Sequence, residues 1–207
     1  MGPERLTIAI PTYRRPLALG ALLEDLHLQD CVPDRLVVVD GEGGSEEVRG
    51  AVQRSGWPGR IPTTLIRSTR ANLPFQRNLA GRAVKRQGAL LFLDDDLRIP
   101  DAGSVGELLA ALSDPATVAA TVQISGIAPS PPPSAPARLW GAARQFPPGS
   151  LTPTGVRRAP CPAARFAAVD WLRGGVMAIP AQAFGALQTP AALLALAECG
   201  WGLGEDL

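Results

Sequence analysis

Short apolar runs recur along the first part of the chain, separated by stretches with helical periodicity. Runs of this kind, bounded by turn residues, predict buried strands; they are Leu6–Ile10, Leu36–Val39, Thr63–Ile66, Ala89–Leu93 and Thr117–Ile124. Between them, apolar residues spaced three and four positions apart predict amphipathic helices. These helices are expected to begin at Pro16, Glu46, Pro74 and Gly103, and Gly88 is placed to end the third of them.

A regular alternation of strand and helix indicates the fold class. Strands that are apolar throughout imply a mainly parallel sheet with helices on both faces. The chain is therefore predicted to be α/β, with a Rossmann-like three-layer α/β/α arrangement. In such sheets ligands bind at the carboxyl ends of the strands. The Pro11–Thr12 loop, Asp40 and Asp94–Asp96 each follow a predicted strand, so we expect them to meet at one crevice.

The pattern changes between Ile127 and Ala164, where closely spaced prolines interrupt any regular periodicity. This stretch, 127–164, is predicted to be a long loop or a loosely structured insertion. Regular structure is expected to return with a loop, the Gly174–Gly175 pair and a strand that reaches Ile179. A helix is predicted over Pro190–Cys199.

Composition narrows the classes of function. The chain has 207 residues, enough for one domain with a sizeable core, and its net charge of +1 gives no general attraction to nucleic acid. Its 3 cysteines form no CxxC pair, so neither a zinc site nor a disulfide framework is indicated. No stretch reads as a transmembrane segment and the N-terminus has no signal-peptide core, so we expect a cytoplasmic protein.

Three adjacent carboxylates, Asp94–Asp96, follow the apolar run Leu90–Leu93. Neighbouring like charges raise one another's pKa unless a cation neutralises them, and Mg²⁺ and Mn²⁺ favour oxygen ligands. Mg²⁺ usually takes one or two protein carboxylates and completes its coordination with water and substrate phosphate. The cluster predicts a Mg²⁺ or Mn²⁺ site for a phosphate-bearing substrate, with a solvated acidic turn as the alternative.

Six segments together resemble glycosyltransferase family 2, whose members have the GT-A fold. In chain order they are Ile8–Arg15, Val38–Gly41, Asn72–Ala80, Leu91–Asp96, Gly174–Met177 and Gly204–Leu207. The resemblance implies a single GT-A catalytic domain over residues 1–207 with a mainly parallel mixed sheet. Since family members usually continue beyond the last of these segments, it also leads us to expect a chain truncated at its C-terminus.

The resemblance implies roles for the residues that would hold the nucleotide. Pro11, Thr12 and Tyr13 look like the loop around the base. Asp40 looks like the carboxylate that accepts a hydrogen bond from the base. Arg77 resembles an arginine that contacts the nucleotide, for which a fixed charge and a planar donor fork are suited.

The acidic cluster resembles the DxD motif of the same family. Asp94 matches its first position, near the ribose, and Asp96 its last, on the metal; the metal ligands implied are thus Asp96 and Asp94. Asp95 joins the implied nucleotide-sugar-binding residues. Gly174 and Gly175 resemble a backbone stretch that passes close to the donor sugar, where a side chain would obstruct it.

Two carboxylates at the end of the chain match the family's catalytic motif. Asp206 resembles the catalytic base, with Glu205 as its neighbour or substitute. A carboxylate can accept the proton that the acceptor hydroxyl loses as it attacks the anomeric carbon, and a metal can stabilise the diphosphate leaving group. The implied activity is metal-dependent, inverting sugar transfer from a nucleoside-diphosphate sugar to a hydroxyl.

The resemblance also implies classes of partner. A carboxylate facing a pyrimidine imide serves a UDP-linked or a dTDP-linked donor equally. The family-level acceptor is a glycan, a glycolipid or another acceptor of polysaccharide biosynthesis. A lipid acceptor would bring the protein to the inner face of the membrane as a peripheral protein, without a transmembrane segment.

Alternatives stay open at several points. A nucleotidyltransferase would need a glycine-rich basic loop where Pro11–Tyr13 stands, and a dehydrogenase would need GxGxxG there. A glycosyltransferase-like domain that binds nucleotide without turnover is the non-enzymatic alternative. Asp40 could serve only as a turn residue, and Arg77 could be a solvated helix arginine. Other residues with both a binding and a structural interpretation are Arg14, Arg15, Trp171 and Trp201.

Overall fold

The computed structural model describes residues 5–84, 87–122, 149–151, 168–169, 172 and 174–190. The chain divides into two compact units, and the residues described at 5–84, 87–122 and 174–190 belong to the first. Within the second unit, Gly149 has a left-handed backbone conformation with φ of 83°. The predicted helix over Pro190–Cys199 beyond its first residue, the Trp171 and Trp201 side chains, and the Glu205–Asp206 pair lie outside the described residues.

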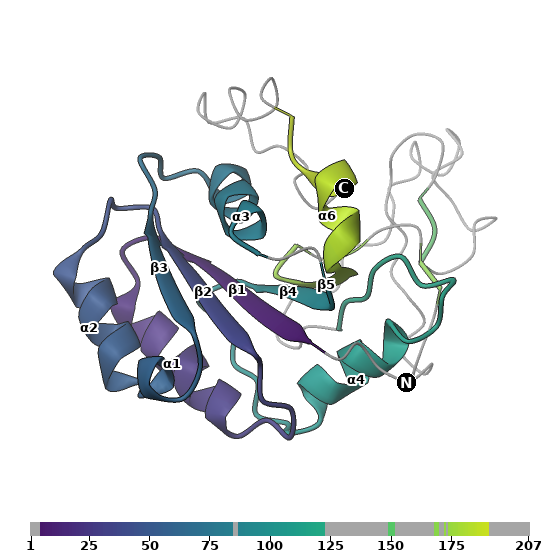
Figure 1. The fold of residues 1–207 in the computed structure, drawn as a ribbon, viewed down its shortest axis with the longest axis horizontal. Coiled ribbons are helices and arrows are strands. Elements are labelled where there is room, and N and C mark those ends of the chain that lie inside the picture. The colour runs from purple at the N-terminus through teal and green to yellow at the C-terminus, as the bar shows by residue number, and fades with distance from the viewer. Residues whose placement is uncertain are drawn as a thin grey trace, which may run out of the picture. The chain divides into compact units, whose positions relative to one another are not determined.

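The first unit contains a five-stranded sheet in the order β3-β2-β1-β4-β5 (Figure 1). The strands are β1 (Leu6–Thr12), β2 (Arg35–Asp40), β3 (Thr63–Arg67), β4 (Ala89–Leu93) and β5 (Val176–Pro180). β1 to β4 are parallel to one another, and β5 pairs with β4 antiparallel. The mainly parallel mixed sheet predicted from the sequence is confirmed.

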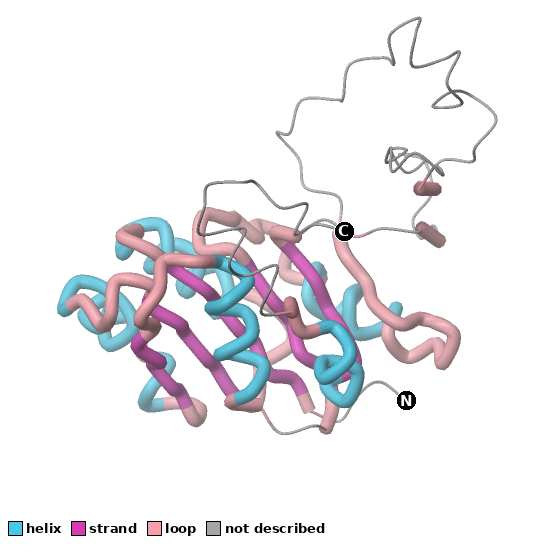
Figure 2. Tube along the Cα trace, turned by 90° about the horizontal axis from the view of Figure 1, so that it is seen from above, coloured by secondary structure: helices cyan, strands magenta, loops and turns pink. Residues whose placement is uncertain are grey.

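Helices cover both faces of this sheet, as predicted. They are α1 (Pro16–His27), α2 (Glu46–Arg54), α3 (Leu73–Arg82), α4 (Ser104–Ala111) and the short α6 (Phe184–Leu187). In Figure 1, α1, α2 and α4 lie on one side of the sheet and α3 and α6 on the other. Seen from above in Figure 2, the strands run side by side between these helices. None of the helices that the structure describes is long and apolar enough to cross a bilayer.

Local sequence explains where two of these helices begin. The Ser45 hydroxyl accepts a hydrogen bond from the Val48 N–H at the start of α2. The Asn72 side chain accepts one from the Phe75 N–H at the start of α3. Each side chain satisfies a backbone donor that the helix itself leaves unpaired, which typically contributes about 1 kcal/mol.

Alternate residues of the central strands build two apolar layers, because successive side chains point to opposite faces of a sheet. Toward α3, a buried cluster contains strand residues together with Ala80 and Phe184; the strand residues are Ala9, Val37, Val39, Leu90, Phe92 and Ile179. The intervening strand residues are also buried, as are four leucines of α1. Burying one such aliphatic side chain contributes about 1.5–3 kcal/mol, so the core fixes the strand tips firmly.

One predicted strand and one predicted helix end were wrong. Within the described part of Thr117–Ile124, only Ala120 makes a β-bridge, to Ala178, and Val118 is 78% exposed. A β-branched run forms a strand only where its side chains are buried by neighbours. Gly88 does not end α3, whose last residue is Arg82. Gly88 instead turns the chain into β4 with φ of 84°, and a Cβ there would overlap the Arg5 carbonyl.

The strand order locates a crevice at the carboxyl edge. From β1 the chain passes to β2 on one side of it, whereas β4 pairs with β1 on the other side. Where the strand order reverses in this way, the loops that leave the two central strands diverge and leave room for a ligand. The residues after β1 and β4 therefore border the expected binding position.

Candidate functional site

A cleft with a volume of about 240 Å³ opens at the carboxyl ends of β1 and β4. Its walls come from the loop after β1, the segment that leads into α3 and the three carboxylates after β4. The lining residues are Pro11, Thr12, Tyr13, Arg15, Ala71, Leu73, Gln76, Asp94, Asp95 and Asp96. The structure thus brings the predicted Pro11–Tyr13 and Asp94–Asp96 segments together.

Asp95 is directed toward β1. The Thr12 hydroxyl donates a hydrogen bond of 2.7 Å to Asp95 Oδ2, and both residues are buried. A buried carboxylate that lacked such a donor would be costly. This contact therefore joins the tips of β1 and β4 at the cleft.

Asp94 is held from the other side by Arg77. Arg77 Nη2 donates to Asp94 Oδ1 over 2.9 Å and to the Gly174 carbonyl over 2.6 Å. The Asp94 N–H donates to the Gly175 carbonyl over 2.9 Å. Arg77, predicted to contact a nucleotide, is placed by the structure between the β4 tip and the glycine pair; its Nε is buried without a hydrogen-bond partner in the described structure.

The surroundings of Asp94 shift its titration. Burial raises the pKa of its carboxyl above the ordinary value, and the nearby Asp96 and Asp95 charges act in the same direction. The Arg77 guanidinium opposes this shift through its charge and its hydrogen bond. In the described structure the three adjacent carboxylates are paired with two arginines, Arg77 and Arg15, so their negative charge is only partly compensated, which favours a further cation there.

Asp96 faces solvent, and Arg15 reaches it across the cleft. Arg15 Nη1 lies 2.6 Å from Asp96 Oδ2 and 3.3 Å from Asp95 Oδ1. The charges of Asp95 and then Asp96 raise the pKa of the guanidinium further above its ordinary value. The Asp96 side chain is 57% exposed, so it is the most accessible of the three carboxylates.

Asp40 occupies a different environment from the cleft carboxylates. It is fully buried and accepts hydrogen bonds from the N–H groups of Glu42, Gly44 and Ser45 over 2.9, 3.1 and 2.6 Å. It is not among the described residues that line the cleft. In this structure Asp40 fixes the loop between β2 and α2, and its contact with a base stays a prediction.

Gln76 is a site residue that the sequence analysis did not single out. Its Nε2 donates to the Thr12 carbonyl over 2.9 Å and to the Val39 carbonyl over 3.4 Å. The side chain is buried and ties α3 to the ends of β1 and β2. A Cβ at Gly41 would overlap Gln76 Nε2, so the glycine after Asp40 allows this close approach. The signal available in the sequence was the amide residue Gln76 within the Asn72–Ala80 segment.

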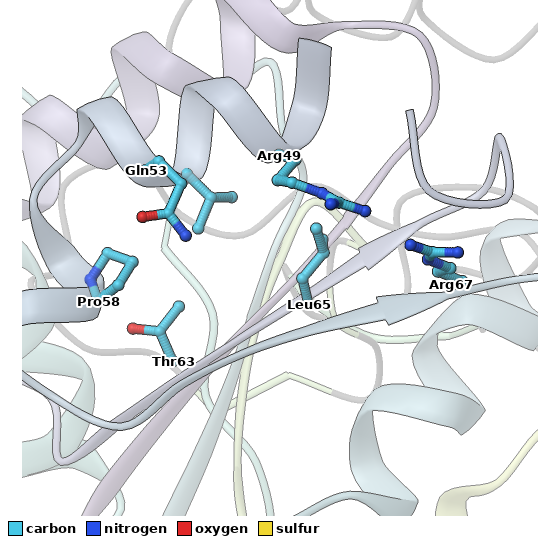
Figure 3. Close-up of a pocket in the computed structure, with 7 residues that line it drawn as sticks. Arg49, Gln53, Pro58, Thr63, Leu65 and Arg67 are labelled. Carbon is cyan, nitrogen blue, oxygen red and sulfur yellow. The ribbon is translucent and has the colours of Figure 1, made fainter. Parts of the chain in front are cut away.

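A second hollow, of about 290 Å³, lies between α2 and β3. Figure 3 shows Arg49 and Gln53 extending from α2 beside Thr63, Leu65 and Arg67 of β3. None of the described residues that line it carries a carboxylate, and none comes from β1 or β4. It therefore lacks both the acidic ligands and the position at the strand-order reversal that mark the cleft.

The donor set of the cleft fits a hard divalent cation. Asp94 Oδ1 and Asp96 Oδ2 are bound to arginines, but each carboxylate has a second oxygen, and oxygen donors suit Mg²⁺ and Mn²⁺. Among the described residues no cluster of three acidic, histidine or cysteine side chains has the geometry of a complete metal site. One or two protein carboxylates suffice where substrate phosphate supplies further ligands. The predicted catalytic pair Glu205 and Asp206 lies outside the described residues.

Comparison with known proteins adds a family match. Residues 7–170 match the model of glycosyl transferase family 2. A search of curated protein sequences found no significant match.

Solved structures share the fold. Mannosyltransferase PcManGT from Pyrobaculum calidifontis, solved with GDP-Man and Mn²⁺, matches with a TM-score of 0.51 and 24% identity over 57% of this chain and 35% of that one. S. aureus TarS 1-349 matches with a TM-score of 0.58 and 16% identity over 90% and 50%. GalNAc-T7, solved with UDP, GalNAc and Mn²⁺, matches with a TM-score of 0.60 and 13% identity over 89% and 37%. The chain thus spans half or less of the length of these proteins, and at such identities the likeness concerns the fold.

Proposed function

This chain belongs to glycosyl transferase family 2, and from that premise we propose that it transfers a sugar from a nucleoside-diphosphate sugar to an acceptor hydroxyl. The observation that carries the proposal is the cleft between the tips of β1 and β4, where three carboxylates meet the Pro11–Tyr13 loop. A diphosphate with a bound cation is the kind of ligand that such an acidic, strand-end cleft accommodates. An acidic surface without a cation would repel the same ligand.

The proposal assigns the cation to Asp96 and Asp94. Asp96 is the more exposed of the two, and Asp94 is kept in position by Arg77. When bound, a divalent ion neutralises the charge that develops on the leaving diphosphate. Mn²⁺ is named in the structures of PcManGT and GalNAc-T7, which supports Mn²⁺ or Mg²⁺ for this chain.

The remaining cleft residues are proposed to hold the nucleoside. Tyr13 is 41% exposed at the cleft, and the Arg14 guanidinium lies 5.1 Å from its ring centroid; the exposed part of the ring is proposed to stack on a base. Thr12 donates a hydrogen bond to Asp95, and Gln76 donates one to the Thr12 carbonyl at the end of β1. These two side chains therefore shape the part of the cleft beside β1. UDP is our first choice of nucleotide, because TarS 1-349 was solved with UDP and with UDP-GlcNAc; dTDP-linked and GDP-linked donors are the next to test.

The catalytic base and the inversion of configuration are proposed from the sequence motif at Glu205–Asp206, and the class of acceptor is proposed from the family. Asp206, with Glu205 beside it, is proposed as the base that takes the proton of the acceptor hydroxyl. A direct attack on the anomeric carbon with this base on the opposite face inverts the configuration. A glycan or glycolipid acceptor is the class that we propose.

Calorimetric titration of UDP with and without Mn²⁺ tests the site, using wild type, Asp96→Asn and the control Asp30→Asn. Asp30 is an exposed carboxylate beyond the far end of α1, so its replacement makes the same change in net charge. We expect Mn²⁺-dependent UDP binding in wild type and Asp30→Asn, and at least a tenfold loss in Asp96→Asn. Absence of binding for UDP, dTDP and GDP would contradict the proposal.

Donor hydrolysis separates an enzyme from a domain that only binds. A transferase whose acceptor is missing commonly passes the sugar slowly to water, so we expect Mn²⁺-dependent release of UDP from one of a panel of UDP-sugars. A protein that binds UDP tightly but releases none from any UDP-, dTDP- or GDP-sugar would favour the binding-only alternative.

A further inference from the structure

Arg15 brings a positive charge into the cleft at the position where the acidic cluster is most exposed. It is the one basic residue among the described residues that line the cleft. A single nitrogen, Nη1, lies within 3.3 Å of both Asp95 and Asp96. Charge-assisted contacts of this kind are stronger than neutral hydrogen bonds, although solvent weakens the pair with the exposed Asp96.

The backbone on both sides restrains Arg15. Arg14 has φ of 55°, the one left-handed non-glycine residue in the described structure. Such a conformation is unfavourable for a residue with a Cβ and persists only where its surroundings impose it. On the other side, Pro16 begins α1 and limits the conformations open to the residue before it.

This restrained turn separates two neighbouring arginines. The Arg14 side chain points to Glu42, with Nε 2.8 Å from its carboxylate, whereas Arg15 points to Asp95 and Asp96. Two adjacent residues of the same charge thus serve different partners. Arg14 is therefore a matched control for any effect of Arg15.

We propose that Arg15 is an internal counter-cation that competes with the divalent ion for Asp96. The inference rests on the metal site assigned under the proposed function. Asp96 Oδ2 is already engaged by the guanidinium, and a metal on this carboxylate would lie within a few ångströms of a second positive charge. Because like charges at such distances repel, the ion binds with full strength only when Arg15 leaves the acidic cluster.

Competition has a defined thermodynamic consequence. The Arg15 contacts stabilise the metal-free cleft, so they lower the affinity of the free protein for the ion. By reciprocity, ion binding weakens the contacts between Arg15 and the carboxylates by the same factor. Arg15 therefore limits how strongly the cleft retains a cation.

Electron paramagnetic resonance titration of Mn²⁺ in the absence of nucleotide tests this, because free Mn²⁺ is counted directly. We expect Arg15→Gln to bind Mn²⁺ about tenfold more tightly than wild type, the order expected for removing one charge close to a divalent ion. Arg15→Lys keeps the charge and should remain near wild type. Arg14→Gln removes an equal charge that is 65% exposed and paired elsewhere, so it should change the affinity less than twofold.

A nuclear magnetic resonance titration with Mg²⁺ observes the exchange itself. The Arg15 Nε–Hε signal, assigned by its absence in Arg15→Gln, should shift as Mg²⁺ saturates the site, and the Arg14 signal should stay in place. An Arg15 signal that does not move while Mg²⁺ binds would overturn the proposal.

The Mn²⁺ and UDP titrations together distinguish failure of the competition from failure of the metal site. Equal or weaker Mn²⁺ binding by Arg15→Gln than by wild type would overturn the competition while leaving the metal site in place. If neither wild type nor Arg15→Gln bound Mn²⁺ without nucleotide, the competition would be overturned. The metal site, to which substrate phosphate contributes ligands, would still be decided by the Mn²⁺-dependent titration of UDP. Should Arg15→Gln fold poorly, Arg15→Met and the Mg²⁺ titration of wild type give the same decision.

Discussion

Thr12 at the end of β1 and Asp95 after β4 share a buried hydrogen bond of 2.7 Å, and both residues line the cleft. Thr12→Val keeps the shape of the side chain but removes the donor. We expect the free energy of unfolding to fall by about 1–3 kcal/mol, because a buried carboxylate loses a partner. Urea denaturation measures this, and Thr12→Ser, which keeps the hydroxyl, should recover most of the loss. An unchanged midpoint in Thr12→Val would contradict the assignment.

Arg77 holds Asp94 and the Gly174 carbonyl at once, so its replacement should affect both stability and the site. For Arg77→Met we expect a loss of about 1.5–3 kcal/mol in the free energy of unfolding, the usual cost of removing hydrogen bonds to a charged group. Arg82→Met, an exposed change on the same helix, should cost less than about 0.5 kcal/mol. Calorimetric UDP titration with Mn²⁺ should weaken only in Arg77→Met, since Asp94 loses its position there.

Asp25 gives the protein a defined dependence on pH. The pKa of its carboxyl is lowered below the ordinary 3.8, chiefly by hydrogen bonds from Arg98 and also by the Ile99 N–H. A carboxyl with a lower pKa in the folded state stabilises the protein above its ordinary pKa, and this stabilisation is lost as the pH falls through the folded-state value. Asp25→Asn should therefore be less stable than wild type at pH 7.

The measurement for Asp25 is urea denaturation of both proteins from pH 7 to pH 3. The difference between wild type and Asp25→Asn should stay constant down to about pH 5 and shrink below about pH 4. A difference that is the same at pH 7 and pH 3 would show that the charge of Asp25 is not responsible. Since Arg98 and Ile99 follow the acidic cluster closely, the same variant should also loosen the segment that carries Asp96.

Gly81 of α3 marks a point of close packing. A Cβ at this position would overlap the Phe184 ring, so we expect Gly81→Ala to cost about 1–3 kcal/mol through overpacking. Gly20 of α1 and Gly106 of α4 have open space around the same position. Their replacement by alanine should stabilise the helices by about 0.5–1 kcal/mol. Thermal unfolding of the three variants measures the contrast, and equal effects at all three positions would contradict it.

The strands and their common crevice could be predicted from the sequence because each rests on a local pattern. An apolar run that ends in a polar residue identifies both a buried strand and its carboxyl end, as in Leu90–Asp94. Parallel pairing then places the loop after β1 beside the acidic cluster. The exception, Thr117–Ile124, has the composition of a strand, but Val118 is exposed. Burial depends on the whole fold and cannot be predicted from the segment alone.

The directions of the side chains at the site were harder to predict from the sequence. The opposite orientations of Arg14 and Arg15 follow from one left-handed residue, for which the sequence offers no glycine as a signal. Asp40 ends β2 and Asp95 follows β4. Asp40 nevertheless anchors a loop through three backbone donors, whereas Asp95 accepts a hydrogen bond from a hydroxyl. Gln76 bridges strands distant in sequence, and only the folded chain brings its two acceptors together.

The antiparallel pairing of β5 with β4 determines when the acidic cleft can be completed during synthesis. β4 ends at Leu93, whereas β5 begins at Val176. A ribosome that adds about 5–20 residues per second needs several seconds to make the intervening chain. During that interval one edge of β4 has no β5 to pair with, and the Gly174 and Gly175 carbonyls that contact Arg77 and Asp94 do not yet exist. The nascent chain can therefore form the β1–β2–β3 half early, but the carboxylates reach their final positions only after the later strand has been translated.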